Sequence, residues 1–366
     1  SATLLPEGTV VLSRTASVGF SVIMGRQMAT TQDFANWVCG TDLLPEFLLY
    51  ALRAMRSDFL RLKMGSTHST IYMPDVKSLR LAVPSVPLQR RVVDFLDAET
   101  ARIDTLIDKQ KKLIELLKEK RQAVISQAVT KGLDPDVPMK DSGVEWLGAV
   151  PEHWRCPVLK FVSQIQTGIA KGKDMSGIST KTISYIRVAN VQDGYLDLSK
   201  VAEIEIAAES IPRYLLKAGD VLMNEGGDYD KLGRGAVWSG EVDPCVHQNH
   251  VFAIRPTDAE PEWIALVAEG EYLKFYFMGV SKQSTNLASI SSKNLMQAPI
   301  VMPPPAERVR ILEHVQRTKS FLDEASIKAT EAIALLIERR TALITAAVTG
   351  QIDVTDYATT TEPTAA

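Results

Sequence analysis

The sequence predicts an α+β protein with two mixed domains of short strands and helices, each followed by one long helix. The phrase AVISQAVTKGLD at 123–134 returns as ALITAAVTGQID at 342–353, an offset of 219 residues that holds without a gap from Pro84 onward. Solenoid repeats recur every ~20–50 residues, so this longer offset indicates a duplicated module instead. Short β-branched runs between glycine and polar turns precede each long stretch, and such runs are typical of strands.

Length and composition indicate a soluble protein of about two domains. The chain has 366 residues, of which 45% are hydrophobic and 23% are charged, enough for each domain to bury its own core. No apolar run reaches the ~20 residues that a membrane span requires. The three cysteines lie far apart and form no CxxC pair, which favours a reducing compartment and predicts a cytoplasmic protein.

The two long stretches are predicted to be helices that pair with each other. Residues 89–129 contain neither proline nor glycine, and apolar side chains recur every seven positions with Gln110 as the one polar member, which is the spacing of paired helices. Gly132 and Gly350 mark the ends. The alternative is that each helix packs only on its own domain. The predicted pairing residues are Leu96, Ile103, Leu117 and Val124 in the first helix and Val315, Leu322, Leu336 and Leu343 in the second.

The stretches before the two helices also match, less tightly. The first domain lacks any counterpart of residues 145–214, so we expect its front half to be missing from the chain. The polar C-terminal tail is predicted to be disordered. The matched pairs are LLPEGTVVL (4–12) with LLKAGDVLM (215–223), TQDFANWV (31–38) with HQNHVFAI (247–254), LPEFLLYAL (44–52) with EPEWIALVA (260–268), and GSTHSTI (65–71) with QSTNLASI (283–290).

This arrangement resembles the specificity subunits of type I restriction–modification enzymes. The resemblance rests on GVEWLGAVPEHW, LKAGDVLM and the endings LLKEKRQAVISQAVTKGLD and LLIERRTALITAAVTGQID, and it covers essentially the whole chain. Each motif alone is weak, but their order, spacing and duplication are together specific. The helix starts PLQRR (87–91) and PPAER (304–308) are loose versions of the family's pattern.

The resemblance implies an α+β fold with two mixed α/β target-recognition domains, joined by two long antiparallel coiled-coil helices with pseudo-two-fold symmetry. The expected boundaries are 1–87 for the C-terminal part of the first recognition domain, 88–132 for the first spacer helix, 133–145 for a linker, 146–305 for the second recognition domain, 306–350 for the second spacer helix and 351–366 for the tail.

The resemblance also implies a non-catalytic subunit that binds double-stranded DNA, reads a split site, and directs adenine methylation and cleavage by its partners. Two methyltransferase subunits and two motor–nuclease subunits are the implied partners. S-adenosylmethionine, ATP and Mg are expected on those subunits, and no cofactor is expected on this chain. A duplicated chain suits this role, because a dimer reads two half-sites through its symmetry, and two diverged copies are able to read different ones.

The candidate DNA-binding residues lie in polar or glycine-containing turns, because base edges and phosphates are read by basic, amide and hydroxyl side chains. The turns QST and GST are the strongest candidates, and the alternative for any single residue is a solvated loop position. The candidates are Lys171, Lys173, Arg187, Asn190, Lys231, Arg234, Gln248, Asn249, His250, Lys282, Ser284, Thr285 and Asn286 in the second domain, and Arg14, Gln32, Lys63, Ser66, Thr67 and His68 in the first.

The charge balance predicts that this chain binds DNA weakly by itself and that partner subunits supply most of the phosphate contacts. The net charge is −3, and residues 150–305 carry 15 basic and 18 acidic side chains. Since non-specific affinity scales with the phosphates neutralised, we expect most phosphate contacts to come from partners. A coiled-coil protein-interaction scaffold without DNA readout is the alternative function. A self-sufficient nuclease or methylase is a third, although GxxxxGK[ST], HExxH and methyltransferase signatures are all missing from the sequence.

Two short motifs raise the question of a metal site. Cys245, His247 and His250 in CVHQNH are zinc-ligand types, but alternation along a strand puts the first two on one face and His250 on the other, and no second ligand cluster follows. GGDYD (226–230) is interpreted as an acidic turn rather than a site for a divalent ion. No bound metal is therefore expected.

Overall fold

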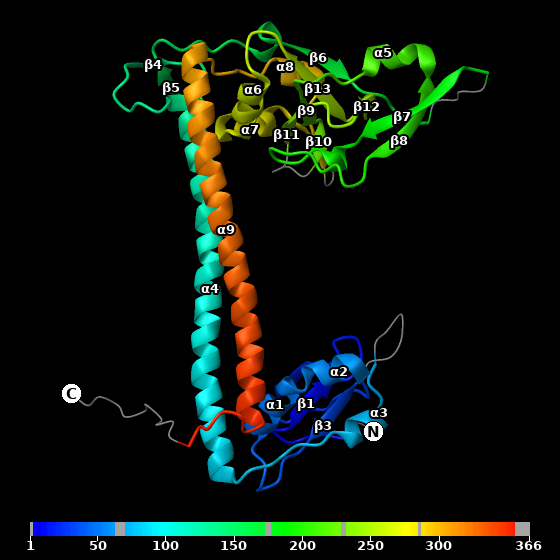
Figure 1. Ribbon diagram of the computed structural model, residues 1–366, viewed down its shortest axis with the longest axis vertical. Helices are drawn as coiled ribbons and strands as arrows, with labels where there is room; N and C mark the ends of the chain where they lie inside the picture. The colour runs from blue at the N-terminus through cyan, green and yellow to red at the C-terminus, as the bar shows by residue number, and fades with distance from the viewer. Residues whose placement is uncertain (1–2, 63–69, 173–176, 228–231, 285–286, 356–366) are drawn as a thin grey trace. The chain divides into compact units, whose positions relative to one another are not determined.

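The computed structural model describes residues 3–62, 70–172, 177–227, 232–284 and 287–355 (Figure 1). The chain divides into two compact units, one of Ser1–Glu115 with Ser326–Ala366 and one of Leu116–Ala325. Both units mix helices and strands, which confirms the predicted α+β class. Each unit also contains one end of each of the two long helices. Among the described residues, no helix combines the length and the apolar character that a membrane span needs.

The first unit is built around an antiparallel sheet of three strands with the order β2-β1-β3. Val10 and Leu12 of the central strand are fully buried and pack against Phe59 and other apolar side chains of the helices that follow. The strands are β1 (Val10–Ser13), β2 (Ser21–Ile23) and β3 (Phe34–Trp37), and the helices are α1 (Pro45–Ala54), α2 (Arg56–Leu62) and α3 (Met73–Ser78).

The second unit contains a larger set of strands. Its main sheet has the order β11-β9-β13-β6, and a second sheet has the order β12-β7-β8 with β12 parallel to β7. The strands are β4 (Met139–Asp141), β5 (Ala149–Pro151), β6 (Ser163–Thr167), β7 (Thr180–Ile186), β8 (Ala202–Ala207), β9 (Asp220–Asn224), β10 (Gly226–Gly227), β11 (Gly235–Trp238), β12 (Cys245–His247), β13 (Val251–Pro256), β14 (Lys282–Ser284) and β15 (Leu287–Ser289). The helices are η1 (Leu159–Phe161), η2 (Val188–Asn190), η3 (Ala208–Ser210), α5 (Ile211–Tyr214), α6 (Pro261–Glu269), α7 (Glu271–Val280) and α8 (Ser292–Met296).

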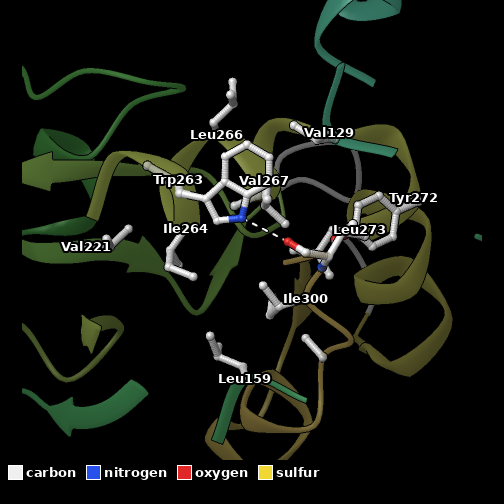
Figure 2. Close-up of a cluster of buried hydrophobic side chains, with 14 of the residues drawn as sticks. Val129, Leu159, Val221, Trp263, Ile264, Leu266, Val267, Tyr272, Leu273 and Ile300 are labelled. Atoms are coloured by element: carbon white, nitrogen blue, oxygen red, sulfur yellow. Dashed lines mark hydrogen bonds between the residues drawn. The ribbon is translucent and has the colours of Figure 1, made fainter. Parts of the chain in front are cut away.

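The core of the second unit centres on Trp263 of α6, which is fully buried (Figure 2). Its indole Nε1–H donates to the carbonyl of Val301 at 2.9 Å, so the ring buries its large apolar surface without leaving a polar atom unpaired. Tyr272 of α7 is buried beside it and donates its hydroxyl proton to the carbonyl of Pro299 at 3.2 Å. Val129 reaches this core from the first long helix and thereby joins the helix to the sheet.

The two long helices are α4 (Val86–Lys131) and α9 (Pro305–Val348), and they pack antiparallel in each unit (Figure 1). In the first unit Leu96 and Ile344 share one apolar cluster, and Asp104 further along α4 pairs with Arg340 at 3.4 Å. Burial differs among the predicted pairing residues. Leu96, Ile103, Val315 and Leu322 are buried, whereas Leu117, Val124, Leu336 and Leu343 are half-buried.

The sheets show the internal repeat, because β2-β1-β3 corresponds to β11-β9-β13. Val10 pairs with Trp37 across the first sheet, and its equivalent Val221 pairs with Ile254 across the second. Trp37 therefore corresponds to Ile254. The sequence match of TQDFANWV with HQNHVFAI equates Trp37 with Ala253 and is wrong by one residue. A slip of one residue moves every side chain of a strand to the other face, so this register decides which residues are buried.

The end of α4 packs against Trp154, the last residue of the motif GVEWLGAVPEHW (143–154). Gly132 follows α4 with φ of +77°, a left-handed conformation that ends helices and favours glycine. A Cβ atom there would lie 3.1 Å from the Trp154 ring. Trp154 is fully buried, and its Nε1–H donates to Glu307 in the first turn of α9 at 3.1 Å. The motif thus joins the end of one long helix to the start of the other.

The first turn of α4 is held by Gln89, which is fully buried. Its amide nitrogen donates to the carbonyls of Asp42 and Pro84, each at 2.8 Å, and its amide oxygen accepts from the backbone N–H of Leu44 at 2.8 Å. All these partners are main-chain groups. The helix start in PLQRR is therefore fixed without any charge.

Arg308 occupies the corresponding position in α9, 219 residues later, and is also buried. Its Nε–H donates to the Glu260 carboxylate at 2.6 Å, and its Nη1 donates to the carbonyl of Pro303 at 3.0 Å. The helix start in PPAER is therefore fixed by an ion pair.

We expect the second unit to lose stability in acid through Glu260. The hydrogen bond from Arg308 lowers the pKa of the Glu260 carboxyl below its ordinary value. A carboxyl whose folded-state pKa is lowered adds stability that is present above the unfolded-state pKa, about 4.3, and that disappears as the pH falls through the folded-state value. Thermal midpoints measured from pH 6 down to pH 3 should fall less steeply for Glu260→Gln than for the unaltered chain.

The matched control is Glu262→Gln, because Glu262 is exposed in the first turn of α6, two residues after Glu260. Its midpoints should follow those of the unaltered chain at every pH. Parallel curves for all three proteins would show that the pair formed by Glu260 and Arg308 has no part in acid sensitivity.

Candidate nucleic-acid interface

A groove of about 500 Å³ in the second unit gathers polar side chains from three separate parts of the chain. Lys282 and His250, two of the residues expected to read DNA, both line it. Glu225, Gln283 and Ser289 line it as well, and of these three only Gln283 lies in a turn that the sequence indicated, the QST turn. The groove therefore combines an ammonium, an amide, a hydroxyl, an imidazole and a carboxylate.

The groove is shaped by the small sheet β10-β15-β14. Gly226 of β10 pairs with Ser289 of β15, and a Cβ atom at Gly226 would lie 2.7 Å from the carbonyl oxygen of Ala288. Only glycine allows two backbones to approach so closely. Lys282 pairs with Ser289 from the other side of β15. This pairing brings residues near 226 and near 282 to one wall.

His250 is oriented by two neighbours. Its Nδ1 lies 2.7 Å from the Glu225 carboxylate, and its Nε2 lies 3.3 Å from the Asn249 side-chain nitrogen. The backbone supports the same contact, because the N–H of Glu225 donates to the carbonyl of His250 at 2.9 Å. Both His250 and Lys282 remain exposed. Lysine donates to guanine and a carboxylate accepts from the cytosine amino group, so this set suits base edges.

Asn190 does not belong to this exposed set, and the expectation that it reads DNA is wrong. The side chain is buried, and both of its amide protons are used, one on the carbonyl of Asp197 at 2.8 Å and one on that of Lys200 at 3.1 Å. Its oxygen accepts from the backbone N–H of Arg187 at 2.9 Å. Asn190 therefore fixes the loop after β7 and leaves no donor for a base.

The other described candidates of the second unit do not line the groove. Lys171 is exposed, with its ammonium 5.4 Å from the Tyr185 ring centre, and it borders a hollow that also contains Glu203 and Glu205. Gln248 accepts from the backbone N–H of Val188 at 3.4 Å. Arg187, Arg234 and Asn249 are half-buried.

In the first unit, Arg14 serves the fold. Its guanidinium donates to the backbone carbonyls of Ile71, at 3.3 Å, and Gln32. These contacts join β1 to two loops, while the Gln32 side chain remains exposed. The remaining candidates lie outside the described residues, as does the side chain of Ser284. They are Lys63, Ser66, Thr67, His68, Lys173, Lys231, Thr285 and Asn286.

The zinc-ligand types in CVHQNH are separated by the fold. Cys245 and His247 are buried in β12, where burial raises the pKa of the Cys245 thiol to about 11 and lowers the pKa of His247. The His247 Nδ1 lies 2.7 Å from the carbonyl of Val251. Within the part of the chain that the structure describes, no group of three or more metal-ligating side chains comes together.

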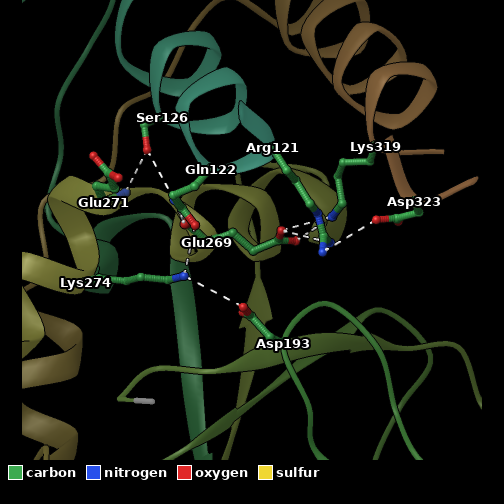
Figure 3. A network of polar contacts seen from close by, with 9 residues as sticks. All are labelled: Arg121, Gln122, Ser126, Asp193, Glu269, Glu271, Lys274, Lys319 and Asp323. Carbon is green, nitrogen blue, oxygen red and sulfur yellow. Dashed lines mark hydrogen bonds and ion pairs between the residues drawn. The ribbon is translucent and has the colours of Figure 1, made fainter. Parts of the chain in front are cut away.

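A polar network ties this unit's mixed domain to the two long helices (Figure 3). Glu269 at the end of α6 is its centre, with Lys319 of α9 at 2.9 Å and Arg121 of α4 at 4.0 Å. Arg121 also faces Asp323 at 3.9 Å. Gln122 of α4 donates to the carbonyl of Glu269 at 2.8 Å. The network fixes the orientation of α6 against both helix ends.

Further contacts extend the network along α7 (Figure 3). Lys274 donates to the Gln122 side chain at 3.3 Å and faces Asp193 at 3.8 Å. The backbone N–H of Glu271 donates to the Ser126 hydroxyl at 3.1 Å. Because α7 leads directly into β14, these contacts also position the strand that carries Lys282.

Comparison with known proteins gives consistent matches. Residues 1–116 match the family described as "Type I restriction modification DNA specificity domain". The EcoKI specificity subunit of Escherichia coli (strain K12) is 22% identical over 332 residues, 86% of this chain and 68% of that protein. The StySPI specificity subunit of Salmonella potsdam is 20% identical over 329 residues, again 86% of this chain and 68% of that protein.

Solved structures show the same fold. A chain from a study of the assembly and conformational transition of the type I R-M system superposes with a TM-score of 0.74 at 18% identity, covering 96% of this chain and 84% of that one. The HsdS subunit from Thermoanaerobacter tengcongensis superposes with a TM-score of 0.57 at 17% identity, covering 95% of this chain and 82% of that one.

Proposed function

We propose that this chain, a relative of type I restriction enzyme specificity subunits, is the DNA-reading subunit of such a complex. In this function it reads a split DNA site and directs adenine methylation and cleavage by methyltransferase and motor–nuclease subunits. S-adenosylmethionine, ATP and Mg would then be held by those partners. The chain itself is proposed to be non-catalytic.

The groove at β10, β14 and β15 is the observation that carries this proposal. It combines Lys282, Gln283 and Glu225, whose side chains provide a donor, a donor with an acceptor, and an acceptor. Such a mixture can distinguish base pairs in the major groove, whereas a purely basic surface would bind phosphates of any sequence. The acidic balance of residues 150–305 agrees with a surface that reads bases and leaves most phosphates to partners.

Lys282→Ala is expected to relax discrimination at one half-site only. A good base contact contributes about 1–3 kcal/mol at its own position and little elsewhere. The experiment is a competition assay with the methyltransferase subunits present, in which duplexes are altered in one half-site at a time. The base pair read by Lys282 should become replaceable in the variant, with about tenfold or greater loss of preference.

The matched control is Lys293→Ala, which removes the same charge from an exposed position on α8. It should leave every half-site preference unchanged. A uniform loss of affinity across all duplexes in Lys282→Ala would mean that the ammonium contacts phosphate. No change at all would mean that the groove does not read DNA.

A further inference from the structure

A second polar cavity, of about 270 Å³, lies in the first unit between β2, the end of α1, the start of α2 and the last turns of α9. Three arginines line it, Arg53, Arg56 and Arg340. The remaining described residues that line it are apolar, glycine or hydroxyl-bearing, and none is acidic. Such a concentration of positive charge is unexpected in a chain whose net charge is −3.

The internal repeat shows where this charge comes from. Arg340 corresponds to Arg121 and Asp104 corresponds to Asp323, each at the offset of 219 residues. The ion pairs they form correspond as well, at 3.4 Å in the first unit and 3.9 Å in the second. The helix framework on this side of the cavity is therefore the same in both units.

On the other side, one equivalent position near the end of the short helix carries opposite charges in the two units. The match of LPEFLLYAL with EPEWIALVA equates Arg53 with Glu269, and the equivalent side chains Phe47 and Trp263 are both fully buried, which supports this register. In the second unit Glu269 neutralises Lys319 and Arg121. In the first unit Arg53 instead adds a third cation beside Arg56 and Arg340.

The loss of the acid is not balanced by loss of the cations. Thr100 is the equivalent of Lys319, so the first unit has one positive charge fewer at this position. Arg53 and Arg56 together add two positive charges, so the net change is one positive charge more. Among the described residues neither Arg53 nor Arg56 forms an ion pair. Their guanidinium groups rest on aromatic rings, Arg53 at 5.5 Å from the Tyr50 centre and Arg56 at 5.7 Å from the Phe20 centre. Stacking of this kind orients a guanidinium and leaves its edge N–H donors available.

Buried polar atoms in the same cavity are also without partners. The hydroxyl of Ser21, a residue only 7% exposed, has no hydrogen-bond partner among the described residues, and the same holds for the Nε of Arg340. Buried polar groups are normally hydrogen-bonded, and unpaired ones cost free energy. An oxyanion in the cavity would accept from these donors and would neutralise Arg53 and Arg56.

We propose that this cavity binds a phosphate group. A tetrahedral phosphate accepts hydrogen bonds from several arginine forks at once and matches their geometry better than a halide does. Two sources share this chemistry, a phosphodiester of the DNA backbone and a free phosphate compound. Only the first source rests on the proposed function, because phosphate binding itself requires no DNA reading.

The first experiment titrates inorganic phosphate into the full chain and measures heat of binding. Arg53→Ala and Arg56→Ala should each weaken binding by about tenfold, since each removes a charge-assisted contact. Arg53→Glu combined with Thr100→Lys copies the residues of the second unit, and this variant should show no binding. Arg90→Ala, which removes an exposed arginine at the start of α4, is the control and should bind as the unaltered chain does.

The second experiment identifies the source. DNA affinity is measured at several salt concentrations for the unaltered chain and for Arg56→Ala. If a backbone phosphate occupies the cavity, the slope of log affinity against log salt should fall by about 0.9 in the variant. An unchanged slope together with weakened phosphate binding assigns the cavity to a free phosphate compound.

The proposal is overturned if Arg53→Ala and Arg56→Ala bind inorganic phosphate as Arg90→Ala does, or if the unaltered chain binds none. Thermal midpoints of all variants show whether each has folded. If the double variant Arg53→Glu with Thr100→Lys does not fold, Arg56→Ala still tests the proposal, because Arg56 is exposed and its removal should leave the fold intact. Half-site discrimination is measured separately, so a failure of the proposed function is distinguishable from a failure of this one.

Discussion

Trp263→Ala is expected to lower the free energy of unfolding of the second unit by about 3–5 kcal/mol, the usual range for removing a large buried aromatic side chain. The ring lies at the centre of the core that joins α6, α7 and the main sheet (Figure 2). Its removal leaves a cavity and also leaves the carbonyl of Val301 without its donor. Urea denaturation followed by far-ultraviolet circular dichroism measures the change.

Trp146→Ala is the matched control for this experiment, because Trp146 is 43% exposed and contacts Tyr276 with a ring-centre distance of 5.9 Å. It removes the same side chain from a position that already meets water, so the midpoint should move far less. Equal shifts for the two variants would contradict the placement of Trp263 at the centre of the core.

Glu269→Ala is expected to have the second large effect, again about 3–5 kcal/mol, because it leaves the largely buried Lys319 without its counter-charge. The side chains of Glu269 and Lys319 are only 10% and 15% exposed, so water screens their interaction weakly. The variant should also loosen α6 from both long helices, since Arg121 loses one of its two acidic partners. Denaturation midpoints report stability, and hydrogen exchange along α6 reports the loosening.

Glu271→Ala is the control here, because the network uses the backbone N–H of Glu271 while the side chain is exposed. Its midpoint should stay close to that of the unaltered chain. Glu269→Gln keeps the shape of the side chain and should fall between the two. If Glu269→Ala and Glu271→Ala unfold at the same urea concentration, the ion pairs contribute nothing to stability.

Much of the fold could be predicted because the chain contains two versions of one module. The long helices follow from sevenfold apolar spacing, and the match at Pro45 and Pro261 places α1 and α6 correctly. The strand match failed by one residue because the one residue that the two stretches share, Gln32 with Gln248, precedes the strand, where nothing distinguishes the buried face from the exposed one. The register is settled by two equivalent pairings, of Val10 with Trp37 and of Val221 with Ile254.

The candidate site was predictable only in part. Lys282 and His250 have side-chain types that bind nucleic acid, and both line the groove. Glu225 was missed because its contact with His250 joins residues 25 apart in sequence, and no pattern in the sequence connects them. Asn190 was wrongly included because an amide in a loop looks the same whether its protons meet water or main-chain carbonyls. Burial, which decides between these cases, depends on tertiary packing.

The two helix starts have a consequence for chimaeras between domains of this kind. The neutral amide of Gln89 meets main-chain groups, so any short helix with the same backbone can precede it. Arg308 needs the carboxylate of Glu260. Grafting the first unit's short helices before α9 would place Leu44 opposite the buried guanidinium, at a cost of about 3–5 kcal/mol. The reverse graft sets Glu260 opposite Gln89, whose amide bonds only main-chain groups and therefore does not depend on that carboxylate. We therefore expect the chimaera with the second unit's short helices before α4 to fold, and the chimaera with the first unit's short helices before α9 to be destabilised.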